Sequence, residues 1–249
     1  MLRKWVVTIA IVAAASVGAR ADDDARKVLD KAVQALGGAE LLKKTKDKSV
    51  HQHSKITVSE MNIEGKMETF TTGKKFKHII DINVNGMDIK QEVCFDEKEL
   101  WIAVNGKVAI TLSKDEQVAA VREAIFADSA VGKAMLGDKS IECSIIGEGK
   151  VEDKPATGVR LTSKGHKDVS AWFDKKSGLL VKIESRGVEF QSGQEVAEER
   201  IINEYKEVEG YKRPSRISVH RDGKKVAEIE VTETKLLDNL DDSTFAKPG

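Results

Sequence analysis

The chain has 249 residues with 41 basic and 41 acidic side chains, so its formal net charge is zero. The lysines stand singly on predicted polar faces and do not form the basic patch that nucleic-acid binding requires, so no nucleic-acid partner is expected. With only three prolines and no long linker of low complexity, the chain is expected to form one domain, as all-β chains of this length commonly do.

The N-terminus has the pattern of an export signal. Arg3 and Lys4 precede an apolar run from Trp5 to Val17, and Ala19-Arg20-Ala21 places small residues where a signal peptidase cleaves. The alternative is a retained membrane anchor, but the run is short for a span and no second apolar segment follows it. We therefore predict a signal peptide over residues 1–21 and a mature chain, 22–249, that is soluble in the periplasm without a stable membrane span.

The first predicted helix of the mature chain begins at three aspartates, residues 22–24. Apolar residues then recur at helical spacing from Ala25 to Leu36, and Gly37-Gly38 ends the pattern. This predicts an amphipathic helix whose apolar stripe covers another part of the protein. A short second helical turn is expected over residues 39–44.

Most of the remaining chain alternates apolar and polar residues with the period of half-buried strands. Asn85-Gly86, Asn105-Gly106 and Asp222-Gly223 are turn sequences typical of tight hairpins. About thirteen strands are predicted, over residues 49–59, 66–72, 75–84, 87–95, 99–104, 107–112, 140–147, 157–163, 169–174, 179–184, 195–205, 216–220 and 226–234.

One helical insertion interrupts the strands. Ser113-Lys114-Asp115-Glu116 matches a capping box, and the apolar residues after it have helical spacing through Asp128. A second short helix is predicted from Ala130 to Leu136. An open sheet of thirteen strands has to curl under its own twist. The fold class is therefore mainly β: a strongly curved, incompletely closed antiparallel barrel, with the N-terminal helix and a mid-chain helical lid on its concave side.

The predicted strands share an extensive apolar face, larger than one core usually needs. Such a face either lines a cavity for an apolar ligand or is filled by its own side chains, and the aliphatic residues here leave both possible. The candidate cavity-lining residues are Phe76, Ile80, Ile82, Ile89, Val93, Leu100, Ile102, Leu179, Val181, Ile183, Ile217, Val219, Ile229 and Val231.

Four stretches carry a resemblance to a known family: residues 32–41 with their double glycine, 173–182, 205–214 and 240–245. In their order and layout they resemble the LolA/LolB-like superfamily of bacterial outer membrane lipoprotein-sorting and periplasmic lipid-carrier proteins. The resemblance implies an unclosed barrel with a helical lid and an apolar cavity that accepts acyl chains. These stretches are turns and element ends, so they specify a fold better than an activity.

The resemblance also implies an arginine inside the barrel that links it to the lid, although no position of this chain matches it from sequence. No cysteine lies near the cleavage site, which places the chain with the soluble branch. The predicted function is an exported binding protein that holds a lipid acyl chain or lipoprotein and is a candidate carrier in the cell envelope. The alternative is a non-enzymatic envelope interaction or sensor protein with a filled core and a protein partner.

Chemical motifs are missing from the sequence. There is no nucleophile elbow, zinc-protease motif, phosphate-binding loop or dinucleotide fingerprint, so neither catalytic residues nor a cofactor are expected. His51 and His53 share a strand face and His78 lies on a nearby strand, but the sequence offers no third and fourth ligand. The three residues are interpreted as surface histidines on an edge strand, and no metal site is predicted.

Two tryptophans fall out of phase with the apolar pattern of their strands. Trp101 and Trp172 would point away from the apolar face, where they mark a partner surface or pack beneath a helix or loop. By strand alternation, Cys94 falls on a polar face and Cys143 on an apolar face, so the two sulfurs should point to opposite sides of the sheet, which argues against a disulfide. A β-bulge would reverse the direction of one side chain, so the pairing stays open.

Overall fold

The computed structural model describes residues 17–188 and 194–248. Most of the predicted signal peptide, residues 1–16, lies outside the described residues. Residues 17–21 form the start of the first helix, so the predicted cleavage point lies inside that helix in the uncleaved chain.

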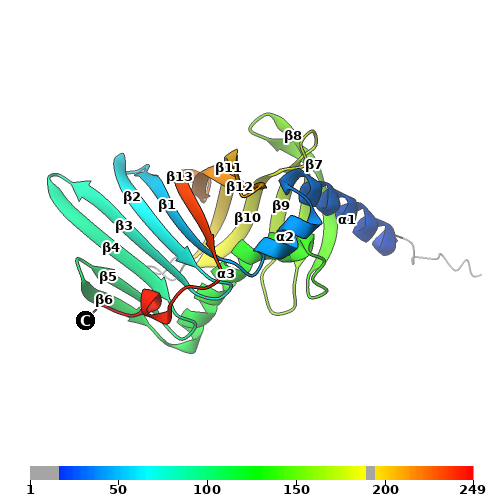
Figure 1. Cartoon of the computed structure of the whole chain (residues 1–249). Coiled ribbons are helices and arrows are strands. Elements are labelled where there is room, and N and C mark those ends of the chain that lie inside the picture. The colour runs from blue at the N-terminus through cyan, green and yellow to red at the C-terminus, as the bar shows by residue number, and fades with distance from the viewer. Residues whose placement is uncertain (1–16, 189–193, 249) are drawn as a thin grey trace, which may run out of the picture.

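Thirteen antiparallel strands form a single curved sheet with the order β6-β5-β4-β3-β2-β1-β13-β12-β11-β10-β9-β8-β7 (Figure 1). The first six strands run from the middle of the sheet to one edge, and the other seven return from the opposite edge. The strands are β1 (Ser49–Val58), β2 (Ile63–Thr71), β3 (Phe76–Val84), β4 (Met87–Phe95), β5 (Leu100–Val104), β6 (Lys107–Leu112), β7 (Glu142–Val151), β8 (Lys154–Thr162), β9 (Val169–Asp174), β10 (Leu180–Val188), β11 (Glu195–Val208), β12 (Tyr211–Arg221) and β13 (Lys224–Leu237).

The predicted strands and hairpin turns are confirmed. Asn85, Asn105 and Asp222 have φ angles of 52°, 50° and 46°, the left-handed region that tight hairpins require, and each precedes a glycine. The main difference is β12, which begins at Tyr211, five residues before the predicted start. Two register shifts, with extra residues Asn203 in β11 and Ser215 in β12, let the pairing continue through Pro214, which cannot donate a ladder hydrogen bond.

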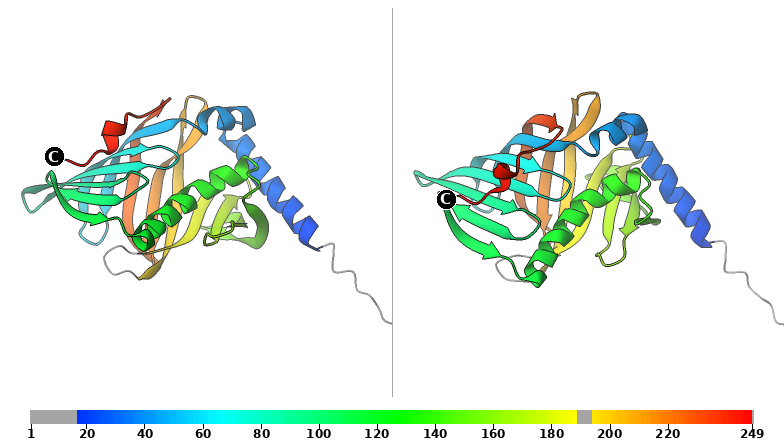
Figure 2. Two further views of the ribbon diagram at one scale, coloured as in Figure 1. Left: turned by 90° about the horizontal axis from the view of Figure 1, so that it is seen from below. Right: turned by 60° about the horizontal axis from the view of Figure 1, so that its bottom comes forward.

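Three α-helices and a short 3-10 helix complete the fold: α1 (Val17–Leu36), α2 (Ala39–Thr45), α3 (Asp115–Met135) and η1 (Asp242–Phe245). Helix α3 connects β6 with β7, the two edges of the sheet, so it crosses the open side of the curved sheet (Figure 2). We call this arrangement the half-barrel. In the described part of the chain, no helix is long and apolar enough to span a membrane.

Two details of the mid-chain insertion differ from the sequence prediction. The predicted break after Asp128 is wrong, because α3 continues through Ser129, whose hydroxyl donates to the carbonyl of Phe126 within the same helix. The predicted cap at Ser113 is also wrong. Helix α3 begins one residue later than that cap requires, and Lys114 is the N-cap residue, whose side chain makes no capping hydrogen bond. The side chain of Glu116, the other member of the predicted capping box, lies outside the described residues.

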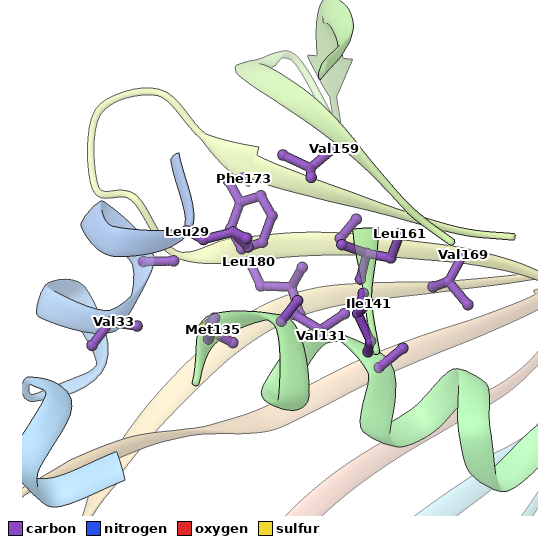
Figure 3. Packing of buried hydrophobic residues seen from close by; sticks show 14 of the residues in the cluster. Leu29, Val33, Val131, Met135, Ile141, Val159, Leu161, Val169, Phe173 and Leu180 are labelled. Carbon is purple, nitrogen blue, oxygen red and sulfur yellow. The ribbon is translucent and has the colours of Figure 1, made fainter. Parts of the chain in front are cut away.

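The largest cluster of buried side chains lies where α1 and the second half of α3 pack against strands at the β7 end of the sheet (Figure 3). A separate cluster joins the first half of α3 to the other end of the sheet, where Val118 and Val121 contact Phe95 and Leu100. Helix α3 is therefore anchored at both ends of the half-barrel. The labelled members of the first cluster are Leu29, Val33, Val131, Met135, Ile141, Val159, Leu161, Val169, Phe173 and Leu180.

The convex face carries its own small core. Phe245 of η1 packs with Cys94, Trp101 and Ala103, and Trp101 is fully buried. Packing under a covering segment is thus the correct interpretation of Trp101. Cys94 and Cys143 form no disulfide.

Trp172 is the half-buried tryptophan of the convex face. Its ring lies so close to Gly158 that a Cβ there would be 3.0 Å from the ring. The indole N–H donates to Glu184 Oε2 at 2.9 Å, and the ammonium of Lys182 lies 5.4 Å from the ring centre. Trp172 is therefore held on the surface of its own sheet.

Helix α1 should contribute substantially to stability through Leu29, which is fully buried in the largest cluster. We predict that Leu29→Ala lowers the free energy of unfolding by about 3 kcal/mol, since it removes buried methyl groups and leaves a cavity. Denaturant unfolding measures this change. The control is Val108→Ala on the exposed edge strand β6, which should change it by less than about 0.5 kcal/mol; an equal loss in both variants would contradict the assignment.

Candidate functional site: the concave face of the half-barrel

A row of cross-strand partners crosses seven strands on the face that α3 spans. We call it the isoleucine row. A Cβ added to its one glycine, Gly65, would be 2.5 Å from Ile82 Cγ2 and 3.4 Å from Ile56 Cγ2, so the neighbouring isoleucines cover that position. Its members are Ile89, Ile82, Gly65, Ile56, Ile229, Ile217 and Ile202.

Four members of this row are incompletely covered, although Ile56 near its centre is buried. Ile82, Ile89, Ile217 and Ile229 are half-buried and belong to neither of the clusters that anchor α3. Burying such side chains stabilises by about 25 cal/mol for each Å² removed from water. The concave face therefore presents an apolar floor between two anchored ends of a helix.

Most of the other predicted lining residues lie on the same face as the isoleucine row. One group packs with the first half of α3, a second group packs with the largest cluster, and three more residues share strands with members of the row. The first group comprises Phe76, Val93, Leu100 and Ile102. The second comprises Leu179 and Ile183. Ile80 shares the face of Ile82 on β3, Val219 that of Ile217 on β12, and Val231 that of Ile229 on β13.

Val181 does not lie on the concave face. A bulge in β10 pairs Leu180 with Phe173 and Lys182 with Trp172, so Val181 is the extra residue between them. It is buried with Val151 beside Trp172 on the convex side. The simple alternation of Leu179, Val181 and Ile183 predicted from sequence fails because the bulge shifts the phase.

An open pocket of about 520 Å³ lies beside the start of β8, the turn between β9 and β10, and β11, and Leu179, Val181, Ile202 and Tyr205 are among its lining residues. The hydroxyl of Tyr205 donates to the carbonyl of Leu180 at 2.7 Å. Burial raises the pKa of Tyr205, so this hydroxyl keeps its proton and holds β11 against β10.

One ion pair links the interior of the sheet to the helix that crosses it. Arg200 of β11 contacts Asp128 of α3, and its Nε lies 3.4 Å from Glu198 Oε1. Burial alone would lower the pKa of Arg200, but Asp128 and Glu198 outweigh it and the pKa is raised. Arg200 thus links the concave side of the sheet to α3. Sequence could not assign it, because its partner is 72 positions away in the chain.

His78 belongs to the same interior. Its Nδ1 lies 3.0 Å from Thr69 Oγ1, and burial lowers its pKa while the charge of Asp128 opposes that shift. The structure separates His78 from the pair His51 and His53, which lie on the convex face beside Phe70. The predicted edge-strand placement is also wrong, because β1 lies between β2 and β13 inside the sheet.

No protein-family model and no sequence of a curated protein matches the chain. Solved structures with a similar fold include a LolA superfamily protein from Nitrosomonas europaea, 14% identical with a TM-score of 0.51, covering 90% of this chain and 97% of that one. A DUF1329 family protein from Desulfovibrio piger is 14% identical with a TM-score of 0.50, covering 89% and 97%. A putative outer membrane lipoprotein-sorting protein domain from Vibrio parahaemolyticus is 11% identical with a TM-score of 0.45, covering 88% and 97%.

The chain thus has a LolA-like fold: an open, curved antiparallel sheet with helices on its concave side. At this level of identity the likeness defines the architecture alone. The sequence-level expectation of an incompletely closed barrel with a helical lid is confirmed.

The lowered pKa of His78 predicts a specific pH dependence. The pKa of His78 is below its ordinary value of 6.5 in the folded protein, so the unfolded chain binds more protons as the pH falls below 6.5. The stability that His78 contributes is present above that pH and is lost as the pH falls through the folded-state pKa. We expect His78→Gln to reduce the slope of unfolding free energy against pH just below 6.5, measured by denaturant unfolding. His220→Gln serves as control, and an unchanged slope in His78→Gln would exclude this role.

Proposed function

We propose that the chain is an exported, non-enzymatic binding protein of the periplasm that holds an apolar chain, a lipid acyl group or the acyl groups of a lipoprotein, on the concave face of the half-barrel. The isoleucine row carries this proposal. Four of its members, Ile82, Ile89, Ile217 and Ile229, are half-buried and belong to neither of the clusters that anchor α3. A ligand with long apolar chains matches such a floor, because binding removes both surfaces from water without requiring directional bonds.

Helix α3 acts as the lid in this proposal. It is joined to the sheet by apolar contacts at its ends and by the Arg200–Asp128 pair between them. The side chain of Asp128 is 59% exposed while that of Arg200 is 23% exposed, so water competes for the carboxylate and the link is weak. A weak polar link over an apolar floor allows the lid to yield to a ligand and to close again after release.

The alternative of an envelope interaction protein with a filled core has less support. It relied on Trp101 or Trp172 as an exposed partner surface. Trp101 is fully buried beneath the C-terminal segment and Trp172 is packed on Gly149 and Gly158. Neither tryptophan offers a protruding anchor of the kind that dominates protein interfaces.

Native mass spectrometry of the protein purified from an exporting bacterial host, followed by organic extraction and lipid analysis, tests the proposed function. We predict that acyl species copurify near one per chain and that Ile229→Trp abolishes their retention, since the larger indole would occupy the proposed acyl-binding face. Ile146→Trp makes the same change on the exposed edge strand β7 and should retain them. A clean apo mass that also ignores added fatty acid and lipopeptide would overturn the carrier proposal.

The lid link generates a second prediction. Asp128→Asn removes the charge opposite Arg200 and should lower ligand retention by roughly fivefold, corresponding to about 1 kcal/mol for a partly exposed pair. Dissociation of a fluorescent fatty acid measures the effect. Asp115→Asn, at the first residue of the same helix, is the matched control; equal dissociation rates in Asp128→Asn and the parent protein would show that the pair does not gate the site.

A further inference from the structure

Three potential metal ligands meet on the convex face, on the opposite side of the sheet from the isoleucine row. His51 and His53 lie two residues apart on β1, and Glu68 of β2 is the cross-strand partner of His53. One possible ligand atom from each residue lies within 4.8 Å of the other two. We call these three residues the histidine cluster.

The contacts within the cluster converge on one carboxylate oxygen. Glu68 Oε1 lies 2.7 Å from His51 Nε2 and 3.9 Å from His53 Nε2. Ligand atoms bound to one zinc ion at about 2.0–2.2 Å are roughly 3–4 Å apart. Small rotamer changes therefore bring all three atoms into the first coordination shell of one ion.

The surroundings hold the cluster in place and leave it accessible. Phe70 stacks on the ring of His51 with a centroid distance of 4.4 Å and an interplanar angle of 11°. Both ligand-bearing strands are interior strands with regular pairing to each other across the cluster. The side chain of His53 is 44% exposed and that of Glu68 is 33% exposed, so an ion reaches the site from solvent without a change of fold.

A fourth position lies on the neighbouring strand. Glu233 of β13 is the other cross-strand partner of His53, and its Oε2 lies 4.0 Å from His53 Nε2. Its Oε1 pairs with Lys235 Nζ at 3.1 Å, so Glu233 reaches an ion only through its second oxygen or by leaving Lys235. Three protein ligands with a fourth position for Glu233 or water match the open type of zinc site.

We propose that His51, His53 and Glu68 bind one divalent first-row transition ion. Two imidazoles and one carboxylate favour Zn²⁺, Co²⁺, Ni²⁺ or Cu²⁺ over Mg²⁺ and Ca²⁺, which prefer sites made only of oxygen ligands. The proposal does not depend on the proposed lipid-binding function, because the two sites occupy opposite faces of the sheet. The sequence showed the His-x-His pair but not its third ligand, which the register of β1 against β2 supplies.

The experiment is a titration of the untagged, chelator-treated protein with Zn²⁺, followed by isothermal calorimetry, with Mg²⁺ as a comparison ion. We expect one Zn²⁺ per chain, at least a tenfold loss of affinity in His53→Ala and in Glu68→Gln, and no response to Mg²⁺. His220→Ala, which removes a histidine from β12 outside the cluster, should bind Zn²⁺ as the parent does. Circular dichroism without metal establishes that each variant is folded.

Co²⁺ supplies a second readout that does not depend on affinity alone. A site with two imidazoles and a carboxylate in low coordination gives visible d–d absorption, and Glu68→Gln, which preserves the size of the side chain, should change that spectrum. The proposal is overturned if the parent shows no saturable Zn²⁺ binding. It is equally overturned if His53→Ala and Glu68→Gln keep the parent's affinity and cobalt spectrum.

Discussion

A single helix has to join the two edges of one thirteen-stranded sheet, and the rest of the structure depends on that connection. The sheet curls under its own twist, but α3 lies between the edge strands β6 and β7, so the sheet stays open. The helix is held by Val118 and Val121 at one end and by Val131 and Met135 at the other. Between those anchors the concave face keeps apolar side chains that the protein itself covers only in part.

The two faces of the sheet carry different kinds of side chain. On the concave face, the isoleucine row supplies apolar area and Arg200 with Asp128 supplies the polar link to the helix. The convex face is covered near β4 and β5 by Phe245 of the C-terminal segment. It remains open further along, where His51 and His53 stand beside Glu68. Because strand residues alternate between faces, one strand contributes to both: β1 places Ile56 inside and His53 outside.

Local rules were sufficient to predict the elements of this fold. Asn-Gly and Asp-Gly pairs locate the hairpins because only residues that tolerate positive φ fit those turns. Alternation then identifies the strands between them, and Gly37-Gly38 marks the end of α1. The helix pair predicted from Ser113 to Leu136 is instead one helix. Its continuity depends on being anchored at both ends, which is a tertiary constraint that helical spacing does not contain.

The sites were harder to predict, because they depend on register across strands that are distant in sequence. One bulge in β10 turns Val181 to the face opposite Leu180 and Ile183. The apolar and polar alternation of this strand does not predict that bulge. Arg200 becomes the link to the lid only because β11 passes below Asp128. The histidine pair acquires a carboxylate because β2 pairs in register with β1; a shift of one residue would turn Glu68 to the other face and separate it from both imidazoles.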